Sequence, residues 1–111
     1  MSKDAQFKFY RVIPVADFPA GERLFVEIGN QPIVIFNLGD SFYAIADICS
    51  HDDGQLGDGE LEGFEIICPR HGARFDIRTG KALSAPAFVD IPVYSVRIRE
   101  GWLEVGLSGT D

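Results

Sequence analysis

The stretches DICSHDDGQLGDG at residues 47–59 and EIICPRHG at residues 65–72 hold every cysteine and histidine of the chain, two of each. We call these stretches the first arm and the second arm. Each arm supplies one cysteine and one histidine: Cys49 and His51, then Cys68 and His71. A lone cysteine is commonly a small buried hydrophobic residue, and a lone histidine is commonly an ordinary core or surface residue rather than a metal ligand. Four such residues confined to two short arms indicate instead a site that binds metal.

Two kinds of metal site fit this donor set. A tetrahedral zinc ion accepts two cysteines and two histidines, so zinc remains an alternative. Zinc modules usually group like ligands, however, whereas each arm here mixes the two types. A [2Fe-2S] cluster explains the mixing, with Cys49 and Cys68 on one iron and His51 and His71 on the other. We therefore expect these four residues to be the metal ligands and the cofactor-binding residues.

The flanks of the arms are typical of β-strands. Alternating, β-branched and aromatic segments are separated by turns such as Gly39-Asp40 and Glu100-Gly101, and no 3.6-residue apolar repeat persists. The expected strands are 7–12, 23–28, 33–36, 42–46, 91–98 and 102–107. This pattern predicts an all-β sandwich or barrel. The Gly-rich, charged segment between the flanks needs something to organise it, which a metal site would do.

Composition and size narrow the class of protein. The chain has 111 residues, 46% of them hydrophobic, which suits one packed domain and leaves no room for a large substrate pocket. Its 17 acidic and 10 basic residues give a net charge of −7, without the basic footprint of a nucleic-acid binder. No apolar run approaches the roughly 18 residues of a membrane span, and the start has no hydrophobic signal segment. We expect a cytoplasmic protein with no membrane or nucleic-acid partner.

The motif Cys49-x-His51-x16-Cys68-x2-His71, followed by Gly72, resembles the cluster-binding signature of Rieske iron–sulfur proteins. The likeness continues through FDIRTGK at 75–81 and covers nearly the whole chain. The resemblance implies an antiparallel β-sandwich base (about 7–46 and 85–107) with an inserted cluster-binding subdomain (about 47–84), within one domain of residues 1–111. It implies a Rieske-type [2Fe-2S] cofactor on the four ligands and a loop around Pro86 that covers the cluster.

High-potential members of the family resemble this chain but differ at four positions. They carry one extra cysteine in each arm, joined as a disulfide, where this chain has Gly54 and Arg70. They also place Ser and Tyr hydrogen-bond donors where this chain has Ala73 and Phe75. The resemblance therefore implies a reduction potential toward the low end of the Rieske range.

These departures resemble the bacterial ferredoxins that serve ring-hydroxylating oxygenases. The resemblance implies a one-electron carrier, not itself an enzyme, between a flavin-dependent reductase and the terminal oxygenase of an aromatic-ring dioxygenase system. Two alternatives stay open: the Rieske-like small subunit of an assimilatory nitrite reductase, and a zinc-stabilised interaction module without a redox role. Acidic residues gather between Asp52 and Glu65 and basic residues between Arg70 and Lys81, which further suggests a bipolar rim that orients partners.

Overall fold

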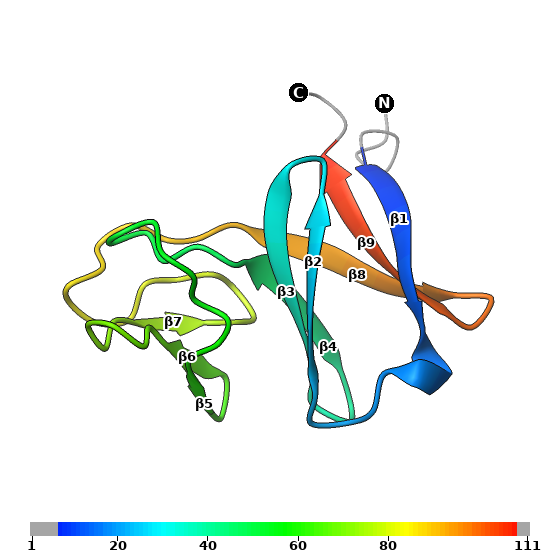
Figure 1. Cartoon of the computed structure of the whole chain (residues 1–111), viewed down its shortest axis with the longest axis horizontal. Helices are drawn as coiled ribbons and strands as arrows, with labels where there is room; N and C mark the ends of the chain where they lie inside the picture. Colours follow the sequence, from blue (N-terminus) through cyan, green and yellow to red (C-terminus); the bar gives the residue numbers. More distant parts are fainter. Residues whose placement is uncertain (1–6, 109–111) are drawn as a thin grey trace.

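The computed structural model describes residues 7–108 and contains nine β-strands and a short 3-10 turn, η2 (Val15–Asp17). The strands are β1 (Phe7–Pro14), β2 (Arg23–Ile28), β3 (Gln31–Asn37), β4 (Phe42–Ala46), β5 (Glu60–Glu62), β6 (Glu65–Ile67), β7 (Arg74–Asp76), β8 (Val93–Arg99) and β9 (Trp102–Ser108). Six form one sheet in the order β1-β9-β8-β4-β3-β2, and three form a small sheet in the order β5-β6-β7. All these pairings are antiparallel, so the all-β expectation is confirmed (Figure 1).

The larger sheet folds over into two layers. Strands β4 and β8 pair only at Ala44 with Tyr94 and at Ile45 with Val93, and the sheet turns at this short contact. Strands β1, β9 and β8 lie on one side of the turn and β2, β3 and β4 on the other (Figure 1). Side chains from both layers share one core, including Ile33 and Ile35 of β3 and Leu103 and Val105 of β9. The expected antiparallel sandwich is therefore present.

Strand β3 is buried on both faces. Its side chains alternate between the faces: Ile33 and Ile35 belong to the sandwich core, whereas Val34 and Phe36 belong to a second core. This second core also contains Ile66 of β6 and Phe75 of β7. Because both faces are covered, β3 reads as an unbroken apolar run in the sequence. The second core packs the small sheet and both arms against the base.

Glu104 of β9 is a buried acid held between two arginines. It pairs in register with Arg11 on β1 and with Arg97 on β8, and its Oε1 accepts a 2.7 Å hydrogen bond from Arg97 Nε. The Arg97 hydrogen bond, with the nearby charge of Arg11, lowers the pKa of Glu104. A lowered pKa stabilises the fold above the unfolded value of about 4.3. That stabilisation disappears as the pH falls through the lower folded pKa.

We therefore expect Glu104→Gln to lower the denaturant midpoint at pH 7, and the gap from the parent protein to shrink as the pH drops below about 4. Chemical denaturation of the variant and the parent at several pH values measures this gap. Acid also affects the two metal-binding arms, but both proteins contain them, so that effect cancels in the difference. Glu100→Gln is the matched control, because Glu100 meets Arg11 with 74% of its side chain exposed. A gap that stays constant with pH would contradict the assignment.

No helix among the described residues is long and apolar enough to cross a membrane.

Candidate metal centre

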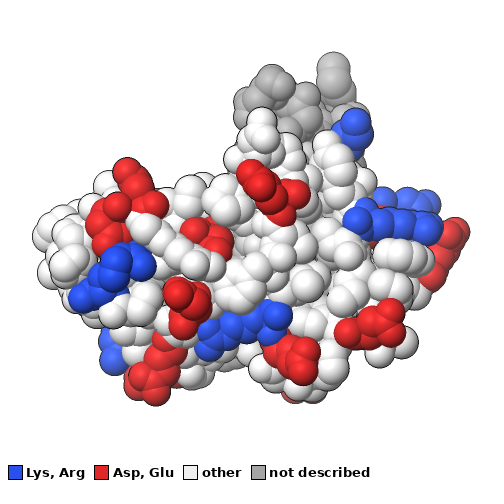
Figure 2. All heavy atoms as spheres, viewed as in Figure 1, with Lys and Arg blue, Asp and Glu red and all other residues white. Residues whose placement is uncertain are grey.

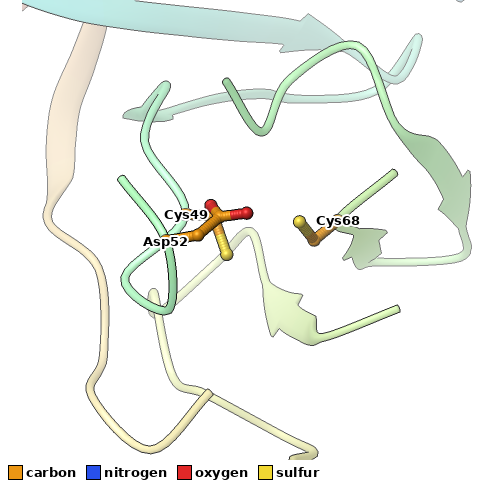
Figure 3. Close-up of side chains that lie close together, drawn as sticks. All are labelled: Cys49, Asp52 and Cys68. Carbon is orange, nitrogen blue, oxygen red and sulfur yellow. The ribbon is translucent and has the colours of Figure 1, made fainter. Parts of the chain in front are cut away.

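The structure brings the four sequence-predicted ligands together at the end of the molecule formed by the arms. Cys49 follows β4, and Cys68 directly follows β6. Their sulfur atoms lie within 4.8 Å of each other and of a carboxylate oxygen of Asp52, and both side chains point into the space between the arms (Figure 3). Imidazole nitrogens of His51 and His71 also lie within 4.8 Å of each other, and the ring centroids are 5.0 Å apart.

The two kinds of donor differ in their exposure. Cys49 and Cys68 are 0% and 1% exposed, and both are free thiols. In contrast, His51 is exposed, as is His71, whose side chain is 54% accessible. Burial raises the pKa of the Cys49 thiol, and bound iron would offset this cost because a coordinating thiol is deprotonated. Two buried thiols and two exposed imidazoles fit an iron–sulfur cluster that would be held by mixed sulfur and nitrogen donors.

Both arms form the same kind of tight loop around their cysteine. In the first arm, Cys49 N donates to Gly54 O and Asp53 N donates to Cys49 O, each over 2.8 Å. In the second arm, the bonds recur at the same spacing along the chain: Cys68 N donates to Ala73 O over 2.7 Å, and Gly72 N donates to Cys68 O over 3.0 Å. Such loops aim both cysteine side chains toward their common interior.

Each loop needs one residue with a left-handed backbone. In the second arm that residue is Gly72, with φ +75°, and in the first arm it is Asp53, with φ 60°. Gly54 does not have a positive φ. The first arm thus places this conformation on the residue before its glycine. Aspartate is among the few non-glycine residues that tolerate this conformation, which explains the shift to position 53.

A buried carboxylate that the sequence analysis did not single out shapes the first arm. Asp47 is 8% exposed, and its oxygens accept hydrogen bonds from the backbone N–H groups of Leu56 and Gly57 and from Gln55 Nε2. These bonds connect the two ends of the loop that carries Cys49. The only sequence signal was an acid at the start of the arm, which most often indicates a solvated loop.

Arg23 at the start of β2 ties the base to the first arm. Its Nη1 donates to the carbonyl oxygens of Gly57 and Gly59, each over 2.5 Å, and its guanidinium lies 5.3 Å from the centroid of the Phe36 ring. The partners are more than thirty residues away along the chain, at separations of 34 and 36. No local pattern could have indicated this link.

The segment around Pro86 lies against the first arm. Ser50, between Cys49 and His51, donates its hydroxyl to the carbonyl of Val89 over 2.5 Å. The neighbouring Phe88 is 84% exposed. This contact is compatible with the expected covering loop, and covering of the cluster by Pro86 stays a prediction.

The arginines at this end of the molecule pair with acidic side chains close to them. Arg70 bonds to Asp52, Arg74 to Glu62 and Glu65, and Arg78 to Asp76. The Arg70 guanidinium, together with the Gly54 N–H, holds the pKa of Asp52 well below its usual range. Basic and acidic side chains consequently alternate at this end of the molecule (Figure 2). The expected bipolar rim is wrong, because most of the basic groups that would form one pole are neutralised locally.

A β-sandwich base whose two looped arms present a pair of buried thiols and a pair of exposed imidazoles defines a class: small iron–sulfur electron-transfer domains. The family model of the Rieske [2Fe-2S] domain matches residues 8–95. The chain therefore belongs to the Rieske [2Fe-2S] domain family, and its cofactor is a Rieske-type [2Fe-2S] cluster. The zinc alternative has no support from this match.

Relatives and solved structures agree with the family. The chain is 42% identical over 96 residues to the 3-phenylpropionate/cinnamic acid dioxygenase ferredoxin subunit of Escherichia coli (strain K12), covering 85% of this chain and 89% of that protein. It also matches a chain in the solved complex of reduced oxygenase and oxidized ferredoxin in carbazole 1,9a-dioxygenase, with a TM-score of 0.80, 34% identity and coverage of 91% and 93%.

A further solved structure bears on the nitrite reductase alternative. It is a putative NADH-dependent nitrite reductase small subunit from Mycobacterium tuberculosis, with a TM-score of 0.77, 20% identity and coverage of 91% and 96%. At this identity the likeness shows the fold alone. The much higher identity to a dioxygenase ferredoxin identifies the chain as an electron-carrying ferredoxin rather than a catalyst, and makes the nitrite reductase alternative the weaker one.

Proposed function

We propose that this ferredoxin takes one electron at a time from a flavin-dependent reductase and passes it to the terminal oxygenase of an aromatic-ring dioxygenase system. The similarity to the 3-phenylpropionate dioxygenase ferredoxin supports the oxygenase partner, and the match to a solved oxygenase–ferredoxin complex supports direct docking. The proposal includes a flavin-dependent reductase as the electron donor and a cytoplasmic location for the protein. The named relatives act with different aromatic substrates, so the proposal goes no further than that class.

Within this proposal, Cys49 and Cys68 would hold one iron of the cluster, and His51 and His71 would hold the other. The observation that carries it is the close approach of two exposed imidazoles, 5.0 Å apart, beside two buried thiols. When bound, the cluster takes up and releases a single electron. The buried cysteines exclude water from the inner side. The exposed histidines give a partner its shortest route to the metal.

Two residues that follow the second arm predict a low reduction potential. Ala73 and Phe75 are both fully buried at this end of the molecule, and neither side chain offers a hydrogen-bond donor. Hydrogen bonds to the sulfurs raise the potential by stabilising the reduced, more negative cluster. We expect a midpoint near −150 mV, at the low end of the Rieske range. Direct redox titration measures it, and a midpoint far above zero would contradict the expectation.

The full electron path is tested by reconstitution. The holoprotein is mixed with the flavin reductase and the terminal oxygenase of an aromatic-ring dioxygenase system, and aromatic product formed per NADH is measured. We expect turnover that requires this chain and is absent with cluster-free protein. The contrary result is cluster reduction by the reductase followed by no reoxidation in the presence of the oxygenase and its substrate.

A further inference from the structure

The two arms are joined by a set of polar contacts from one side chain. Arg70 of the second arm reaches across to the first arm, where its Nε lies 2.6 Å from Asp52 Oδ2 and its Nη2 lies 3.0 Å from Asp52 Oδ1. Its Nη1 donates to the carbonyl oxygen of Gln55 over 2.7 Å. One guanidinium therefore makes three hydrogen bonds to the first arm, two of them as a fork on a single carboxylate.

Gly54 makes room for this guanidinium. A Cβ at position 54 would lie 2.6 Å from Arg70 Cζ and 2.7 Å from its Nη2, which is closer than carbon and nitrogen atoms approach without a covalent bond. The flat guanidinium therefore packs directly over the glycine backbone. Both cysteines of the chain are free thiols, so no disulfide joins the arms.

The Asp52–Arg70 pair lies next to all four proposed ligands. Asp52 directly follows His51, and Arg70 directly precedes His71. A carboxylate oxygen of Asp52 also lies within 4.8 Å of both cysteine sulfurs. The other arginine ion pairs at this end do not join the two arms. Arg78 bonds to Asp76, two residues away. Arg74 bonds to Glu62 and Glu65 within the small sheet.

We propose that Asp52 and Arg70 are positioning residues that hold the two arms together as a non-covalent clamp and keep the four ligands in place. This inference rests on the ligand set proposed above. A forked ion pair sets both the distance and the orientation of the arms, which a single point charge does less well. Unlike a disulfide, the clamp is indifferent to thiol reductants. Because its charges are partly exposed, with 35% of the Arg70 and 21% of the Asp52 side chain accessible, salt weakens it.

The first test measures how fast the holoprotein loses its cluster. The oxidised protein is exposed to an excess of the iron chelator bathophenanthroline disulfonate, and the decay of the visible absorbance is followed at low and at high salt. We expect Arg70→Gln and Asp52→Asn each to lose the cluster about fivefold faster than the parent at low salt. High salt should accelerate loss from the parent and leave the double variant Asp52→Asn/Arg70→Gln unchanged.

Arg78→Gln is the matched control. It removes the same kind of side chain from an ion pair at the same end of the molecule, but that pair does not join the arms. We expect Arg78→Gln to lose its cluster at the parent rate. Arg70→Lys keeps the positive charge but cannot make the forked pair, so it should lose its cluster at an intermediate rate. If Arg70→Gln folds poorly, Arg70→Lys takes its place in the comparison.

The midpoint potential supplies a readout that loosened packing alone would not produce. Removing only Arg70 leaves an uncompensated negative charge beside the cluster and should lower the potential. Removing only Asp52 leaves a positive charge and should raise it, and the double variant should lie between the two.

Two results would overturn the clamp. One is a parent-like rate of cluster loss in both single variants, and the other is equal acceleration in Arg70→Gln and Arg78→Gln. Either result, obtained with a parent protein that binds its cluster through the four proposed ligands, rejects the clamp alone. A parent protein that binds iron without those ligands rejects the proposed site itself.

Discussion

Replacing Cys68 with serine is expected to abolish assembly of the [2Fe-2S] cluster. Cys68 is 1% exposed and lies at the centre of the second arm's loop, where its backbone N–H and carbonyl already close the turn. Iron–sulfur clusters bind soft thiolate donors. The serine side chain is shorter than that of cysteine, and its oxygen is a harder donor than sulfur. Iron and acid-labile sulfide per chain, with the visible spectrum, measure the loss. Cys49→Ser should have the same effect.

The control for this prediction is Ala73→Ser, which places a hydroxyl at a fully buried position directly after the second arm without removing a proposed ligand. We expect Ala73→Ser to keep a full complement of iron and sulfide. A Cys68→Ser protein that retained both at the parent level would show that Cys68 is not a ligand.

The second large effect is expected at Gly59, where the first arm passes the backbone of β6. A Cβ at this position would overlap the carbonyl oxygen of Ile67 and would lie 3.2 Å from Pro69 Cδ. Backbone atoms cannot move aside as a flexible side chain can, and Ile67 directly precedes Cys68. We expect Gly59→Ala to lower the free energy of unfolding by about 3 kcal/mol, the upper part of the range for overpacked sites. It should also speed cluster loss.

Chemical denaturation of the holoprotein measures this cost against a second glycine variant. Gly63 lies in the turn between β5 and β6 with φ +60° and no atom within 4 Å of its built Cβ. Gly63→Ala therefore carries only backbone strain, about 1 kcal/mol. If Gly59→Ala proved no more destabilised than Gly63→Ala, the close approach at Gly59 would be wrong.

The main strands could be predicted from the sequence, and candidate ligands could be named, because their signals are local. The apolar run at 33–36 falls within β3, and the Glu100-Gly101 turn separates β8 from β9. The four candidate ligands stood out because the chain has no other cysteine or histidine. The strands of the small sheet are three residues each, too short for an alternating pattern to register.

Contacts between distant segments could not be predicted in this way. Arg23 begins a strand of the base, and only the folded chain brings it to the carbonyls of Gly57 and Gly59. The same holds for Arg70, which reads as one charge in a mixed loop until the fold sets it against Asp52. Arg70, Arg74 and Arg78 all pair with acidic side chains in the fold, so counting charges along the sequence gave a bipolar rim that the structure does not have.

The most direct test of the ligand set is pulsed electron paramagnetic resonance of the dithionite-reduced protein made with 15N-labelled histidine. His51 and His71 are the only histidines of the chain, so the label reports on these two side chains alone. We expect nitrogen couplings from two imidazoles to the cluster spin, both of which change with the label. A reduced cluster whose couplings are unaffected by the label would contradict it.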